Sequence, residues 1–125
     1  MAKPANPRSW RAKFADALRG CKWGFRSQSS FAVHLFAAVL VVVAGFSLRV
    51  GMTEWCLLAL SIAIVLAAEM LNTSIEYLAK AISNQHNANI GRALEVAAAA
   101  VLMASLGAAT VGMIIFGAKL LQLFQ

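Results

Sequence analysis

Two carboxylates and one amide share a helix face at the end of a long apolar stretch. Glu69, Asn72 and Glu76 are spaced three and four residues apart, so at 100° per residue they lie on one side of a helix. A charged side chain in the hydrocarbon of a membrane costs about 2.5–3.5 kcal/mol on insertion scales, and two carboxylates on one face repel unless a cation or proton lies between them. This polar face therefore predicts a site.

The spacing also limits what the site can do. Glu69 and Glu76 are about 10 Å apart along the helix axis, so they share one bare metal ion only if their long side chains converge. One can act as a base while the other holds Mg²⁺, because oxygen ligands with phosphate as a co-ligand suit magnesium. A structural interpretation competes: the two carboxylates pair with basic residues such as Lys22, Lys80 or Arg92 and close an interface.

The composition predicts a membrane protein. Hydrophobic residues make up 61% of the 125 residues and charged residues 13%, whereas soluble domains are about 45–50% apolar. The mean hydropathy is +0.73. The net charge of +6 comes mostly from basic residues ahead of the first apolar span, which favours anionic lipid headgroups over nucleic acid as the partner.

The hydrophobic pattern predicts an all-α membrane protein with two parts. Residues 1–30 are expected to hold a basic amphipathic surface helix, and residues 31–125 a three-helix transmembrane domain. The spans are placed at about 31–49, 54–82 and 92–124, with a cytoplasmic loop at 83–91. The basic N-terminus predicts a multi-pass membrane protein with a cytoplasmic N-terminus. Three helices shelter a buried carboxylate poorly, so we expect an oligomer whose protomers meet at the site.

Two polar residues of the other spans add to the candidates. His34 lies inside the first span, where a membrane histidine is expected to bond a neighbour and a proton relay is the alternative. Glu95 lies in the first turns of the third span, where the helix dipole favours a carboxylate. Glu95 needs a partner there, and Mg²⁺, Arg92 or a substrate hydroxyl could serve.

Four motifs extend over most of the chain: Phe31-Ala-Val-His34, Trp55-Cys-Leu-Leu, Ala68-Glu69-Met-Leu-Asn72-Thr-Ser-Ile-Glu76 and Gly91-Arg-Ala-x-Glu-x-Ala-Ala-Ala-Ala-Val101. Together they resemble the prokaryotic diacylglycerol kinase and undecaprenol kinase family. The resemblance implies a small homotrimer with three spanning helices and a surface helix per chain. It also implies transfer of the γ-phosphate of MgATP to a lipid hydroxyl, of undecaprenol or diacylglycerol, at the cytoplasmic interface.

The resemblance gives the polar face its roles. Glu69 would be the general base toward the lipid hydroxyl, Glu76 would bind Mg²⁺, and Asn72 would orient the reacting groups. We expect the nucleotide to contact residues of the surface helix, the loop and the later helices, namely Arg19, Lys22, Glu76, His86, Arg92 and Glu95. Headgroup attraction for Arg19 and Lys22 and a solvated loop position for His86 are the alternatives. The expected lipid contacts are Phe31, Glu69, Asn72 and Glu95.

The chain departs from the family pattern mainly on the nucleotide side. Gln28 stands where a metal-binding glutamate is usual, and its amide oxygen leaves it a predicted metal ligand. Leu94 replaces a lysine that contacts phosphates, Lys80 replaces an aspartate, and Gln85 lies in an altered loop. Two other functions therefore stay open: a Mg²⁺-dependent lipid phosphatase in which Glu69 activates water, and a non-catalytic membrane homologue.

Overall fold

The computed structural model describes residues 7–27, 29–82 and 85–125. It holds four helices: α1 (Trp10–Ser27), α2 (Ser29–Ser47), α3 (Met52–Ile82) and α4 (Ala88–Leu123). Three segments are long and apolar enough to cross a membrane, namely Ser30–Ser47, Met52–Ile82 and Ala88–Leu123. The predicted all-helical class is confirmed, with an N-terminal helix and three candidate membrane-spanning helices.

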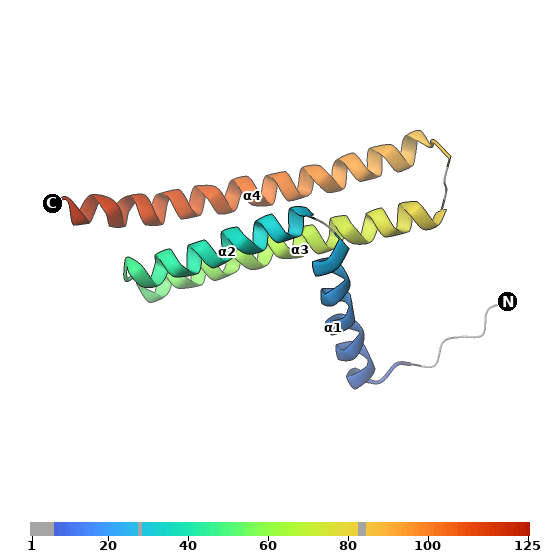
Figure 1. Cartoon of the computed structure of the whole chain (residues 1–125), viewed down its shortest axis with the longest axis horizontal. Helices are drawn as coiled ribbons and strands as arrows, with labels where there is room; N and C mark the ends of the chain where they lie inside the picture. The colour runs from blue at the N-terminus through green and yellow to red at the C-terminus, as the bar shows by residue number, and fades with distance from the viewer. Residues whose placement is uncertain (1–6, 28, 83–84) are drawn as a thin grey trace.

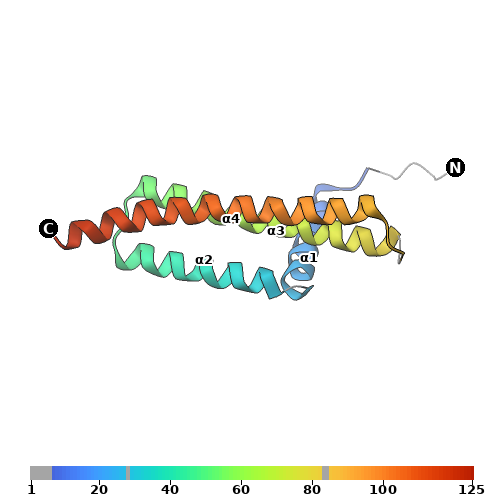
Figure 2. The ribbon, with the colours of Figure 1, turned by 90° about the horizontal axis from the view of Figure 1, so that it is seen from above.

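The three long helices run side by side, and α1 projects away from them at a steep angle (Figure 1). Helix α3 is the central element, because both α4 and α2 pack mainly on it while α2 and α4 contact each other little. Figure 2 shows this arrangement from above, with α4 over α3 and α2 to one side. Most large apolar side chains of the spans are exposed in the single chain, as expected of helices that face lipid or another protomer.

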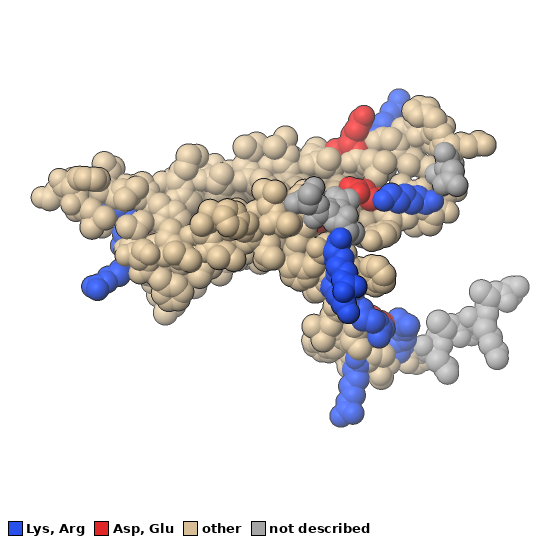
Figure 3. All heavy atoms as spheres, viewed as in Figure 1, with Lys and Arg blue, Asp and Glu red and all other residues tan. Residues whose placement is uncertain are grey.

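Helix α1 is basic and amphipathic, as its sequence pattern predicts. The Ser9 hydroxyl accepts from the N–H of Ala12 at 3.3 Å and caps its first turn. Where α1 meets the spans, buried Gly24 lies against the Met70 side chain of α3. Basic side chains gather over α1 and at the two ends of the bundle, whereas the middle of the visible face carries none (Figure 3). That distribution suits a surface helix beside a membrane-spanning bundle.

The connection between α2 and α3 is tight. Arg49 has a φ of 54°, and the N–H of Val50 donates to the Gly45 carbonyl at 3.2 Å, which closes the end of α2. The Glu54 carboxylate then accepts from the N–H of Gly51 at 2.8 Å at the start of α3. Helix α3 therefore begins at Met52, slightly before the predicted 54.

Helix α4 begins at Ala88 rather than at the predicted Arg92. The Asn87 side chain accepts from the N–H groups of Asn89 at 2.9 Å and Ile90 at 3.3 Å and so caps the helix. Asparagine is favoured both in loops and at the N-cap of a helix. An Asn-rich segment therefore predicts a loop without showing at which asparagine the next helix begins. Glu95 consequently lies beyond the first turn, where the helix dipole contributes little.

Candidate active site

Glu69 is the centre of the site. It lies on α3 with 1% of its surface exposed, and each of its oxygens has a partner on α2. Oε1 lies 2.6 Å from Nδ1 of His34, and Oε2 accepts from the Ser30 hydroxyl at 3.3 Å. The sequence-based alternative that Glu69 pairs with a lysine or arginine is wrong for the part of the chain that the structure describes, because its ion-pair partner is His34.

Asn72 and Glu76 form the second part of the polar face. Asn72, 8% exposed, donates from Nδ2 to Oε1 of Glu76 at 2.9 Å. A hydrogen bond to a carboxylate is charge-assisted and directional, so it fixes the orientation of the Glu76 side chain. The predicted polar face is present: α3 carries a deeply buried carboxylate and, further along, a hydrogen-bonded amide and carboxylate.

A cavity of about 410 Å³ lies between α1 and α3 beside this face. Its lining residues include Cys21, Gly24, Met70, Thr73 and Tyr77. The Thr73 side chain is buried, and its Oγ1 has no hydrogen-bond partner among the described residues. Buried hydroxyls are normally satisfied, so Thr73 offers a polar contact to a ligand in this cavity. Sequence reasoning missed Thr73, because a threonine beside a polar stripe is unremarkable in a helix.

Arg92 lies near the same face from the other side. It lines, together with Asn72 and Asn89, a cavity of about 630 Å³ between α3 and α4. The structure thus brings together Arg92 of α4 and Asn72 of α3 around one cavity. Lys80, which the sequence offered as another cation, instead has its Nζ 5.9 Å from the centre of the Tyr77 ring.

The remaining predicted residues are less closely assembled. Arg19, Lys22, His86 and Glu95 are exposed, and Arg19 pairs with Asp16. Phe31 is 1% exposed and packs edge-on against Phe25 with ring centroids 4.7 Å apart, so in the single chain it is a packing residue. Gln28, the predicted metal ligand, lies outside the described residues.

Glu95 does not contact the partner that the sequence suggested within the part of the chain that the structure describes. Within residues 7–27, 29–82 and 85–125 it makes no hydrogen bond or ion pair with Arg92 or any other residue. The same residues contain no group of three or more His, Cys, Asp or Glu side chains that could hold a metal ion. A divalent cation at Glu76 would therefore need further oxygen ligands, which a bound phosphate can supply.

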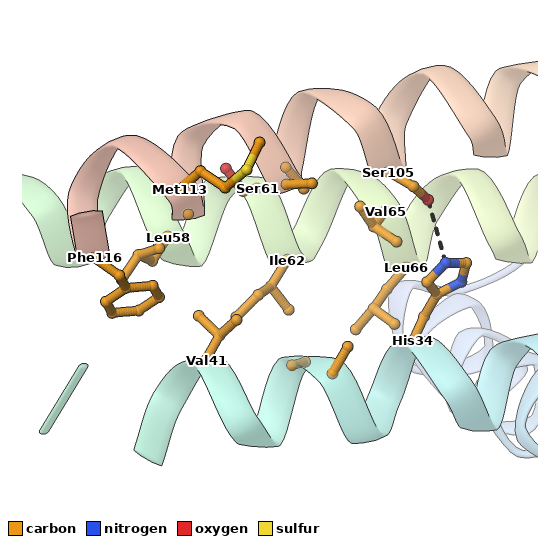
Figure 4. Close-up of a pocket in the computed structure, with 15 residues that line it drawn as sticks. His34, Val41, Leu58, Ser61, Ile62, Val65, Leu66, Ser105, Met113 and Phe116 are labelled. Atoms are coloured by element: carbon orange, nitrogen blue, oxygen red, sulfur yellow. Dashed lines mark hydrogen bonds between the residues drawn. The ribbon is translucent and has the colours of Figure 1, made fainter. Parts of the chain in front are cut away.

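A third, apolar cavity of about 420 Å³ runs between α2, α3 and α4. His34 and Ser105 lie at one end of it and Phe116 at the other (Figure 4). His34 bonds both Glu69 and Ser105, so the expectation that it bonds a neighbour is confirmed. The two partners could not be found from the sequence, because they lie on different helices.

Sequence comparison decides the family. Residues 15–116 match the family described as Prokaryotic diacylglycerol kinase. The chain belongs to this family of prokaryotic lipid kinases. The matched segment includes every described residue of the polar face and its partners, from Arg19 to Ser105.

Three curated proteins are similar to this family member. Undecaprenol kinase of Bacillus subtilis (strain 168) is 32% identical over 107 residues, which cover 86% of this chain and 87% of that protein. Diacylglycerol kinase of Synechocystis sp. is 30% identical over 117 residues, which cover 88% and 67%. Diacylglycerol kinase of Haemophilus influenzae is 28% identical over 88 residues, which cover 70% and 75%.

Proposed function

We propose that this protein is an ATP-dependent lipid kinase that phosphorylates the hydroxyl of undecaprenol or diacylglycerol at the cytoplasmic face of the bacterial inner membrane. The observation that carries the proposal is the buried Glu69 carboxylate, held by two partners on α2 and followed on the same helix by the bonded pair of Asn72 and Glu76. A base for a hydroxyl and a ligand for phosphate-bound cations are the two groups that this reaction requires.

In the proposed reaction Glu69 takes the proton of the lipid hydroxyl as the hydroxyl oxygen forms a bond to the γ-phosphorus. The bond from the γ-phosphorus to the bridging oxygen breaks, and ADP leaves with that electron pair. Glu76 and Gln28 would hold Mg²⁺ through oxygen atoms, which are the donors that this ion prefers. Held there, the ion would supply neutralisation of the phosphate charge. Asn72 keeps the Glu76 carboxylate oriented through its 2.9 Å hydrogen bond.

We place the nucleotide beside α1 and the end of α3. The cavity there is lined by Thr73, whose hydroxyl has no hydrogen-bond partner among the described residues, and α1 carries the exposed cations Arg19 and Lys22. Arg92, which borders the neighbouring cavity with Asn72, can replace the positive charge that Leu94 lacks. His86 and Glu95, both exposed, are proposed as outer contacts of the nucleotide, and Glu95 also of the lipid headgroup.

The lipid acceptor approaches from the bilayer. The apolar cavity that begins at His34 and ends at Phe116 is lined by side chains that suit a hydrocarbon chain. At its polar end His34 contacts Glu69. Phe31 and Asn72 complete the expected lipid contacts. We further propose a homotrimer with cytoplasmic N-termini, supported by the basic α1 and by Gly107 and Gly117 of α4, which face open space among the described residues.

The kinase reaction is tested with purified protein in lipid-containing micelles, labelled ATP, and undecaprenol or diacylglycerol as acceptor. Glu69→Gln should lower the rate of label transfer at least about 100-fold, because a positioned base contributes roughly 10²–10⁴-fold. Glu54→Gln is the matched control: Glu54 lies at the other end of α3, where it bonds Gly51 and lies near Lys119, so its rate should be unchanged.

Two results would contradict the kinase proposal. Phosphate release from a lipid phosphate in the absence of ATP, lost in Glu69→Gln, would establish the phosphatase alternative. Wild-type protein that transfers no label and releases no phosphate would indicate a non-catalytic homologue.

A further inference from the structure

Three side chains from three helices form one hydrogen-bonded chain beside the apolar cavity. His34 of α2 has its Nδ1 2.6 Å from Oε1 of Glu69 on α3 and its Nε2 3.2 Å from Oγ of Ser105 on α4. The Ser105 hydroxyl also donates to the carbonyl of Val101 at 2.8 Å. Figure 4 shows the His34 ring pointing from α2 toward Ser105.

The hydrogen positions in this chain follow from counting donors. A serine hydroxyl has one proton, and Ser105 donates it to Val101, so Oγ must accept from His34. Nε2 of His34 therefore carries a hydrogen. A neutral imidazole with a hydrogen on Nε2 has a lone pair on Nδ1, which would face a lone pair of the Glu69 carboxylate at 2.6 Å.

Two acceptors cannot stay that close, so one further proton must lie between His34 and Glu69. The 2.6 Å separation lies at the short end of hydrogen-bond lengths, where bonds between charged partners are found, at about 2.7–2.9 Å for N–H···O. If the proton belongs to Nδ1, His34 is an imidazolium and Glu69 a carboxylate. If it belongs to the carboxyl group, Glu69 is neutral and cannot take a proton from a hydroxyl.

We propose that His34 is a positioning residue that donates from Nδ1 to Oε1 of Glu69 and keeps this buried carboxylate ionised as the base. The imidazolium supplies the counter-charge that a carboxylate with 1% exposure needs. Oε2, which Ser30 contacts at a longer 3.3 Å, then faces the lipid hydroxyl. Ser105 fixes the ring by accepting from Nε2. The inference rests on the proposed role of Glu69 as base.

Among the described residues, the surroundings of the His34 ring offer no charged partner other than Glu69. The described side chains lining the cavity around His34 are apolar apart from Ser61 and Ser105. Among the described residues, Glu69 is the one charged group within ion-pair distance of His34. Glu69 is therefore the counter-charge that the structure offers to the His34 ring.

Nitrogen NMR of protein labelled with ¹⁵N-histidine tests the pairing without any kinase assay. The chain has two histidines, so His86→Gln assigns the signal of His34. We expect both ring nitrogens of His34 to carry hydrogen in the wild type at neutral pH. In Glu69→Gln the amide can donate to Nδ1, and the ring should become neutral with hydrogen on Nε2. A wild-type ring with one protonated nitrogen would overturn the inference.

Kinetics test the consequence for the reaction. His34→Leu should lower kcat about 10- to 100-fold, the loss expected for one hydrogen bond to a charged group, with less than about twofold change in the KM for ATP. His34→Asn, whose amide nitrogen can take the place of Nδ1–H, should recover part of this loss. Equal kcat values for the two variants would overturn the inference, because a purely structural residue would not respond to a restored donor.

Ser105→Ala has a matched control on the same helix. Thr110 makes the same kind of backbone bond, to the Leu106 carbonyl at 2.8 Å, but does not contact His34. Ser105→Ala should lower kcat about threefold to tenfold, and Thr110→Ala should leave it unchanged. Equal effects would refute the role of Ser105. Full activity of Glu69→Gln would instead refute the proposed function, while the NMR result on His34 would still decide the pairing.

Discussion

The hydrogen bond between Asn72 and Glu76 predicts that two substitutions of Asn72 respond differently to added Mg²⁺. Asn72→Leu keeps the approximate volume but removes the donor that lies 2.9 Å from Oε1 of Glu76. Asn72→Asp replaces the donor by a second carboxylate at that position. In the first variant Glu76 loses its orientation, whereas in the second the two carboxylates repel unless a cation lies between them.

The size of the first effect follows from the bond that is lost. A hydrogen bond to a charged group contributes about 1.5–3 kcal/mol, and 1.4 kcal/mol corresponds to a factor of ten in affinity. Asn72→Leu should therefore raise the KM for MgATP about 10- to 100-fold. Added Mg²⁺ should not restore it, because the variant lacks an orienting group rather than a cation.

Asn72→Asp should be impaired at low Mg²⁺ and recover as the concentration of Mg²⁺ rises, because the cation bridges the two carboxylates. The assay is the KM for ATP measured in lipid-containing micelles over a range of free Mg²⁺. Asn89→Leu is the control: Asn89 lines the same cavity as Asn72 but lies on α4, away from the polar face of α3. If both Asn72 variants respond identically to Mg²⁺, Asn72 does not orient a cation ligand.

Two further predictions concern stability at the other end of the bundle. A Cβ on Gly45 would lie 2.5 Å from the Trp55 ring, so Gly45→Ala should destabilise the protein by about 1–3 kcal/mol and lower its Tm in detergent. Gly91→Ala is the control and should not lower the Tm, because a Cβ on Gly91 meets open space among the described residues. The ion pair between Lys119 and Glu54 spans 3.6 Å and is partly exposed, so Lys119→Met should cost no more than about 1 kcal/mol by the same thermal unfolding and leave kinase activity intact; a larger loss would mean that the pair is buried in an oligomer.

The sequence predicts the elements and the polar face because both depend on local spacing. Long apolar runs identify spanning helices whatever packs on them, and Glu69, Asn72 and Glu76 share a face of any helix that contains them. The predicted start of α4 was wrong because Asn87 acts as its N-cap. The hydrogen bonds that the Asn87 side chain accepts identify the cap, and the sequence does not show them.

Contacts between residues on different helices cannot be predicted from the spacing of residues along one helix. His34 and Glu69 are far apart in the sequence, and their contact depends on how α2 packs on α3. The sequence offered lysine and arginine as counter-charges for Glu69 because they are always charged. A histidine in an apolar span was expected to bond a neighbour, but the sequence does not say which residue on another helix that neighbour is.

The length of α3 explains why one helix can serve both a lipid and a water-soluble phosphate donor. A helix needs about 20 residues to cross the hydrocarbon, and α3 has 31, from Met52 to Ile82. If the crossing begins near Met52, it ends at about the position of Glu69, and Glu76 lies roughly 10 Å further along the axis. The proposed base is thus at the depth of a lipid hydroxyl, whereas the proposed cation ligand extends toward water. Glu69 needs a counter-charge from within the bundle, the role proposed for His34, whereas Glu76 is partly exposed and is open to cations and phosphates from the solvent side.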